Sequence, residues 1–522
     1  MRRFALVLCV VCVAELAHAR SLPHYQLDVT VDRDARRVFG RARIELQNDS
    51  ATPLSTIWLW RYPERFATRS PKLNDYNFWW IYPRRFNPGG MRTGAVIVDG
   101  RAAAVTVEDQ KQAGAGTLLR VVPPQPIAPH ARAVIELEFE TRVPTRYGPF
   151  GCFRGTCTLA GGFYPMLVET GARGQPLFLA PPGRGDYRVT TRVTRVSDVV
   201  VNGTLYAVEK GGALTVALGP SAAAALIVGP PKLRSYEADE LGVHIILYSG
   251  AARPVPSPPE HLLPYLPANR QKRVLDTVKD AIDLLDELHL PLPRGETIRL
   301  VEGALRIELA QAQPGFVFLS DRIFDIFPLD RFLKFHQFEV ARAVYELIIG
   351  QRIAAREKPE DLGWAKGVSA SYLVDLFTLH QYRRAEFARQ ILKWASFIPA
   401  IDRILYAPQV PFASAYFFTL EDSDPLRDTL AQFDNSFPRG KLIFAKLRDL
   451  LGDQMKEILR LQLGGTPIRV AAEKVYKKPL DWFWKQWLGP YPKVDYRFSQ
   501  IHSEREGAGF VHHVVVEKRG AA

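Results

Sequence analysis

The chain has 522 residues, of which 47% are hydrophobic, 24% charged and 11% aromatic, and its formal net charge is +13. This length is too great for a single core and predicts several domains. The composition excludes a disordered tract, a collagen repeat and a heptad array. Because the basic residues are scattered, we expect a solvated basic surface that favours acidic ligands or anionic envelope surfaces, and no nucleic-acid partner.

The first nineteen residues are typical of a secretory signal peptide. A positive start at Arg2 and Arg3 precedes an apolar stretch from Phe4 to Val13, and the small-residue sequence Ala17-His18-Ala19 follows. This pattern predicts cleavage before Arg20 and an exported protein, either periplasmic or secreted. No later segment is long and apolar enough to cross a bilayer, so we expect no transmembrane segment in the mature chain.

Two of the four cysteines would be removed with the signal peptide. The remaining pair, Cys152 and Cys157, lies in the sequence GCFRGTC, and no histidine lies close by in the sequence. A zinc site would need two further ligands, whereas an exported protein meets oxidising conditions. We therefore predict a disulfide that closes a small loop and contributes roughly 2 kcal/mol by restricting the unfolded chain.

Residues 21 to about 235 have the pattern of short β-strands. Residues 25–31 and 40–46 alternate polar and apolar side chains, and the segments 95–98, 133–139 and 187–201 are also expected to be strands. An aromatic loop with two arginines, Asn77-Phe-Trp-Trp-Ile-Tyr-Pro-Arg-Arg-Phe86, lies between the early strands. Such a loop suits a glycan or a peptide, but its commoner role is to fold onto its own sheet edge, which is our expectation.

After a Pro-rich linker at 252–267 the apolar period changes to that of helices. Residues 274–285 follow the 3.6-residue spacing of an amphipathic helix, and two strands are expected at 297–301 and 315–319. Helices are predicted over 333–355, 366–395, 439–463 and 468–488, and one or two strands over 510–517. Strands followed by helices after an all-β first half indicate a multidomain α+β protein.

The layout and three motifs resemble the aminopeptidase-N-like metallopeptidase family. The motifs are Gly162-Phe-Tyr-Pro-Met166, the helix from Gly440 to Gly452, and Asp481-Trp-Phe-Trp-Lys-Gln-Trp487. The resemblance implies a signal peptide (1–19), an all-β saddle domain (20–238), a thermolysin-like α+β domain (239–435), a helical C-terminal part (436–495) and the start of a β appendage or tail (496–522).

The family's zinc motif is H-E-x-x-H with a later N-E-G, which places two imidazoles on one helix face and a glutamate beside the metal-bound water. By resemblance, Phe338 and Arg342 stand at the two histidines, Lys366 at the ligand glutamate and Glu339 at the general base. Ala312 replaces the glutamate that anchors the substrate amino terminus, and Phe437 replaces the tyrosine that stabilises the oxyanion. Four altered elements predict that no zinc is bound and that the parent reaction is lost.

No other catalytic pattern replaces this chemistry. His336 and Glu339 have helical i,i+3 spacing, but such a pair is more often structural, and Ser369 and Ser371 have no nearby histidine. We also expect Glu339 to pair with Arg342 or Lys366, leaving one spare cation. The resulting interpretation is an exported, non-catalytic binding or scaffold protein that uses the former peptidase cleft for a peptide, protein or anionic envelope ligand. The alternatives are a hydrolase rebuilt around Glu339 and a structural envelope protein.

Overall fold

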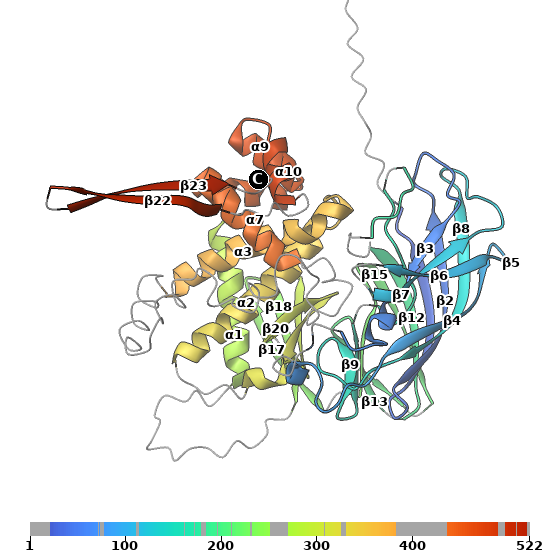
Figure 1. The fold of residues 1–522 in the computed structure, drawn as a ribbon. Coiled ribbons are helices and arrows are strands. Elements are labelled where there is room, and N and C mark those ends of the chain that lie inside the picture. The colour runs from blue at the N-terminus through green and yellow to red at the C-terminus, as the bar shows by residue number, and fades with distance from the viewer. Residues whose placement is uncertain are drawn as a thin grey trace, which may run out of the picture.

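The computed structural model describes residues 21–518, with gaps at 71–72, 74–77, 111–113, 161, 172, 179–183, 196, 210, 230–231, 251–269, 307, 325–329, 383–435, 489–495 and 508. The predicted signal peptide and the Pro-rich linker therefore lie outside the described residues. Within them, no helix is both long and apolar enough to span a membrane. The molecule has a strand-rich N-terminal part beside a second part in which helices cover a sheet (Figure 1).

Three sheets make up the N-terminal part. The strands of the seven-stranded sheet, in spatial order, are β15 (Ala213–Ser221), β12 (Gly185–Val193), β1 (His24–Asp32), β2 (Arg37–Gln47), β8 (Arg132–Arg142), β4 (Gly90–Val98) and β5 (Arg101–Ala102). The four-stranded sheet contains β11 (Met166–Leu167), β3 (Ile57–Trp60), β7 (Gly114–Val122) and β6 (Ala104–Gln110). The five-stranded sheet contains β14 (Thr204–Val208), β13 (Ser197–Val201), β16 (Ala225–Val228), β10 (Thr156–Ala160) and β9 (Phe150–Phe153).

The alternation predicted from the sequence builds the core of this part. In β1 the residues Tyr25, Leu27, Val29 and Val31 are buried, while the residues between them face outward. The predicted strand at 187–201 is instead two strands: β12 belongs to the seven-stranded sheet and β13 to the five-stranded one. One stretch of strand-like sequence therefore concealed a change of sheet.

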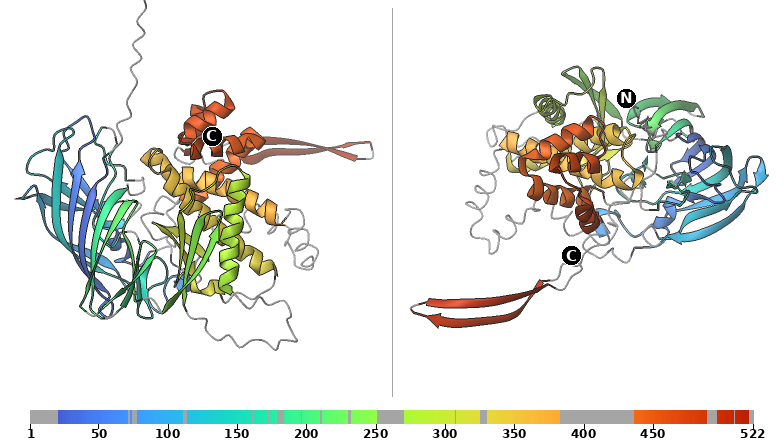
Figure 2. Two further views of the ribbon diagram at one scale, coloured as in Figure 1. Left: turned by 180° about the vertical axis from the view of Figure 1, so that it is seen from behind. Right: turned by 90° about the horizontal axis from the view of Figure 1, so that it is seen from above.

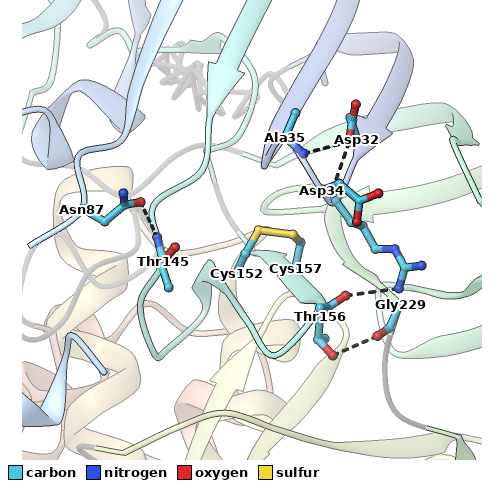
Figure 3. The surroundings of a disulfide bond; sticks show 11 residues. Asp32, Asp34, Ala35, Asn87, Thr145, Cys152, Thr156, Cys157 and Gly229 are labelled. Atoms are coloured by element: carbon cyan, nitrogen blue, oxygen red, sulfur yellow. Dashed lines mark hydrogen bonds between the residues drawn. A yellow bond between two sulfur atoms is a disulfide. The ribbon is translucent and has the colours of Figure 1, made fainter. Parts of the chain in front are cut away.

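The disulfide predicted between Cys152 and Cys157 is present, with an S–S distance of 1.99 Å. The two residues face each other in the antiparallel β9–β10 hairpin. Arg154 and Gly155 form its tight turn with φ values of 48° and 81°, as the right-handed twist of a two-residue hairpin requires. Figure 3 shows the bridge beside Thr156, whose hydroxyl donates a 2.8 Å hydrogen bond to the Gly229 carbonyl.

The second part is built on a mixed five-stranded sheet. Its strands, in spatial order, are β17 (Leu233–Glu240), β18 (Val243–Gly250), β19 (Thr297–Gly303), β21 (Phe316–Ser320) and β20 (Ala310–Gln313). Because β17 pairs with β18 along its whole length, this sheet begins at Leu233 and the expected domain boundary at 238/239 falls inside a strand.

Two of the helices of this part, the first and the second in the chain, pack directly on one face of this sheet, and the others pack on helices. The helices are α1 (Arg270–Glu287), α2 (Asp330–Ile353), α3 (Pro359–Tyr382), α7 (Ser436–Leu451), α8 (Met455–Leu463), α9 (Ile468–Tyr476) and α10 (Asp481–Leu488). The expected helices at 439–463 and 468–488 are each divided. Gly452 and Lys477 both adopt positive φ, and Pro479 cannot continue a helix. One continuous core joins β18, α1, α2, α3 and the helices from α7 to α10, so the C-terminal helices share a core with the sheet.

The opposite face of the same sheet packs on the N-terminal part. In β21, Val317 and Leu319 belong to the helical core, while Phe316 and Phe318 pack against Ala160, Val200, Ala225 and Ile227. The Asn202-Gly203 turn between β13 and β14 closes this contact, because a Cβ on Gly203 would lie 2.6 Å from the Phe316 Cβ. A strand buried on both faces explains the uninterrupted apolar run at 315–319.

The chain ends in a two-stranded hairpin, β22 (Tyr496–Glu506) and β23 (Gly509–Lys518), which extends away from the rest of the protein (Figures 1 and 2). The predicted appendage strand at 510–517 corresponds to β23. Several large apolar side chains of the hairpin, including Phe498, Ile501 and Phe510, are more than 60% exposed.

Candidate functional site

Helix α2 carries most of the residues expected at the site. Phe338, Glu339, Arg342 and Glu346 lie at helical spacings of three and four residues, so one face of α2 presents them together. All four are buried. The helix packs against β20, α1 and α3, which explains why this face is enclosed by protein.

Arg342 is the centre of a buried ion-pair cluster, which we call the Arg342 cluster: Arg342 with Glu308, Glu339 and Glu346. Its guanidinium lies 2.7 Å from Glu346, 3.0 Å from Glu339 and 3.3 Å from Glu308. The same group donates a 2.7 Å hydrogen bond to the Ala310 carbonyl of the edge strand β20. The Arg342 side chain is only 4% exposed. One guanidinium therefore ties α2 to β20.

The charge of this cluster differs from the sequence expectation. We expected a surplus positive charge on Arg342 and Lys366, but one arginine and three glutamates sum formally to two negative charges. Burial raises the pKa of Glu339, opposed by Arg342 and reinforced by Glu308 and Glu346. Burial alone would lower the pKa of Arg342, but the three carboxylates together raise it well above its usual value. The arginine thus stays charged.

Lys366 lies away from the cluster. Its side chain packs across α2 at Gly350, where a Cβ would meet the Lys366 Cδ at 3.2 Å. Gly350 is eight residues beyond Arg342, which corresponds to about 12 Å along a helix axis. Of the two partners expected for Glu339, the structure brings it to Arg342, and Lys366 supplies no spare cation beside it.

The other expected site residues are apolar or serve the core. Ala312 is a half-buried residue of the edge strand β20, opposite Val317, and Phe338 packs in the helical core. Phe437 lies in α7, and its side chain is not among those described. Ser369 donates to Gln462 and Ser371 is buried in α3, so the structure joins neither to a histidine within the described residues.

The described residues at the expected zinc position do not offer the ligand set of a zinc ion. Among the described residues, no group of three or more histidine, cysteine, aspartate or glutamate side chains is arranged to hold a metal. The carboxylates that come together at α2 are instead bound to the Arg342 guanidinium, a fixed cation. His336 is buried with its Nδ1 unpartnered in the described part of the chain, and burial, aided by Arg273, lowers its pKa to about 3.

The sequence interpretation missed two members of the cluster. Glu346 was detectable, because an acidic residue four positions after Arg342 lies on the same helix face. Glu308 lies more than thirty positions away in sequence and reaches Arg342 only because β20 packs against α2. No sequence spacing could have indicated that contact.

Comparisons with known proteins identify the fold. Neither the protein-family models nor the curated protein sequences match this chain. Among solved structures, a mutant of the M1 zinc metallopeptidase from Deinococcus radiodurans covers 90% of this chain and 94% of its own, with 17% identity and a TM-score of 0.50. A further structure of that peptidase covers 90% of each chain, with 17% identity and a TM-score of 0.48. The chain therefore has the fold of the M1 zinc metallopeptidases, the aminopeptidase N family that its sequence resembles.

Proposed function

We propose that this protein is an exported, non-catalytic relative of the M1 peptidases that binds or scaffolds a partner instead of cleaving peptides. The observation that carries the proposal is the Arg342 guanidinium, held among Glu308, Glu339 and Glu346 on the helix expected to carry the zinc motif. The partner is expected to be a peptide, a protein or an anionic envelope ligand.

The Arg342 guanidinium opposes a metal at this position. A dication 4 Å from one fixed positive charge is repelled by about 8 kcal/mol at an effective dielectric constant of about 20. The carboxylates that could serve as ligands are already engaged, because each of them pairs with the guanidinium. Phe338, at the position of the first expected histidine, offers no ligand atom.

Glu339 is also poorly placed to act as a general base. Its Oε2 accepts a hydrogen bond from Arg342 at 3.0 Å, and the residue is only 6% exposed. A general base needs a proton within hydrogen-bond reach and access to the reacting water.

Zinc content and hydrolysis test the proposal directly. Purified chain is incubated with zinc, dialysed, and assayed for bound metal and for cleavage of a broad peptide library. We expect neither stoichiometric zinc nor chelator-sensitive cleavage. Zinc retained at one ion per chain together with chelator-sensitive cleavage would refute the proposal and favour the hydrolase alternative.

A matched variant makes a negative result informative. Phe338→His with Arg342→His removes the guanidinium and places two imidazoles at i,i+4 beside Glu308 and Glu346. We expect this variant to retain zinc where the parent does not. If both proteins fold, judged by their circular dichroism, and neither retains zinc, Arg342 is not what excludes the metal.

A further inference from the structure

The aromatic loop folds inward in part and presents two tryptophans outward. Phe78, Ile81 and Tyr82 are buried with Leu73 in a small core of their own, and Phe86 packs against it. Trp79 and Trp80, in the 3-10 helix at Phe78–Trp80, remain 62% and 44% exposed. Three of the five aromatic side chains of the loop therefore pack inward, and the two tryptophans do not.

This loop is anchored, so the two indoles stand on a fixed base. The Tyr147 amide donates to the Ile81 carbonyl at 2.8 Å. The Thr145 amide donates to the Asn87 side chain at 2.8 Å (Figure 3). Presenting the indoles from a fixed base reduces the ordering entropy lost on binding.

The segment that carries the two tryptophans is rich in basic side chains. Arg69 stacks over the Phe78 ring at 5.0 Å, and the Trp79 ring lies 5.5 Å from that ring. Tyr82 and Phe86 contact each other at 5.3 Å, so the chain doubles back and carries Arg84 and Arg85, both exposed, at the bend. In sequence, residues 65–92 contain six basic residues and one acidic residue.

We infer that this loop is a docking surface for an anionic phospholipid bilayer. Indole rings partition to the boundary between headgroups and acyl chains, and arginines beside them attract anionic headgroups. A protein partner is a weaker fit, because a stable protein interface needs roughly 800 Å² per side and two tryptophans supply at most about 500 Å². The inference is independent of whether the Arg342 cluster is catalytic.

The test uses the full mature chain and vesicles of phosphatidylglycerol, compared with vesicles of phosphatidylcholine alone. We expect binding to the first and a blue shift of tryptophan emission on binding. Trp79→Ala with Trp80→Ala should weaken binding at least about tenfold, because the apolar contact is lost. Arg84→Gln with Arg85→Gln should weaken it about thirtyfold at low salt and less at high salt.

Control variants remove the same groups elsewhere. Trp482→Ala removes a tryptophan of α10 that is 51% exposed, and Arg101→Gln with Arg132→Gln removes two exposed charges of the same β-part. Both controls should bind as the parent does. All the replaced side chains are exposed, so we expect every variant to fold.

Four results would overturn the inference. The parent fails to bind phosphatidylglycerol vesicles, or the controls lose as much affinity as the loop variants. In the third, soluble poly-glutamate binds the parent through Trp79, Trp80, Arg84 and Arg85 and displaces the parent from the vesicles. That result would identify an acidic polypeptide as the partner. Displacement by inorganic phosphate would likewise overturn it, because a free anion would then suffice.

Discussion

Replacing Arg342 by methionine isolates the energetics of the buried cluster. Methionine keeps a long, flexible side chain but removes the charge and the donors that reach Glu308, Glu339, Glu346 and the Ala310 carbonyl. The parent site holds one cation against three carboxylates, whereas the variant leaves those carboxylates buried without it. Breaking a buried ion pair by removing one partner costs about 3–5 kcal/mol. We expect a loss of that order at neutral pH.

The loss should depend on pH in a defined direction. Without the guanidinium, the folded-state pKa values of the buried carboxyls rise above their unfolded values, since burial is no longer opposed. Stability from such groups is present at low pH and is lost as the pH rises through the folded pKa. The difference in unfolding free energy between parent and variant should therefore shrink as the pH falls from about 8 to about 5.

Urea denaturation measures the loss of unfolding free energy. Amide hydrogen exchange of α2 peptides reports the stability of the helix itself within a multidomain chain. Arg460→Met is the matched control, because Arg460 pairs with Glu457 at 2.6 Å on the surface. That change should cost far less stability, because an exposed ion pair contributes little. Adding Glu339→Gln and Glu346→Gln to Arg342→Met should recover much of the loss. A stability of Arg342→Met within about 0.5 kcal/mol of the parent at neutral pH would refute the reasoning.

Three further predictions concern the core and the start of the chain. His336→Gln should flatten the acid destabilisation between about pH 6 and pH 4. In this range the unfolded imidazole takes up a proton, whereas the folded one, with its pKa near 3, does not. The free energy of unfolding of the parent should therefore fall with decreasing pH by up to about 1.4 kcal/mol per pH unit through this residue. Urea titrations across this range measure it, and an unchanged slope contradicts it. Gly440→Ala should lower the thermal midpoint, at a cost of about 1–3 kcal/mol, because its Cβ would lie 2.4 Å from the Gly367 Cα. The control is Gly219→Ala, because Gly219 is exposed and has open space around it. Gly452→Ala is unsuitable as a control, because Gly452 has a positive φ. The intact mass of the exported protein should equal that of a chain that begins at Arg20. A mass that includes the first nineteen residues would show that no signal peptide is removed.

The sequence alone determined much of the architecture. Period-two alternation in residues 25–31 and 133–139 predicted strands that the structure confirms, because a half-buried strand must alternate its side chains. The 3.6-residue spacing of Val274, Val278, Ile282 and Leu285 likewise marked α1. Local periodicity of this kind depends only on residues close together in the sequence. The fold resemblance also followed from motif order, and the solved structures support it.

The tertiary structure decided which residues contact Arg342 and which aromatic side chains of the loop at 77–86 are exposed. Glu308 joins the cluster only through the packing of β20 on α2, which reverses the charge expected from Arg342, Lys366 and Glu339. Lys366 leaves the cluster because its side chain packs against Gly350. Composition marked the aromatic loop, but only the packing of Phe78, Ile81 and Tyr82 separates buried rings from exposed indoles. Sequence spacing records which residues share one helix or strand, whereas contacts between elements depend on how those elements pack in space.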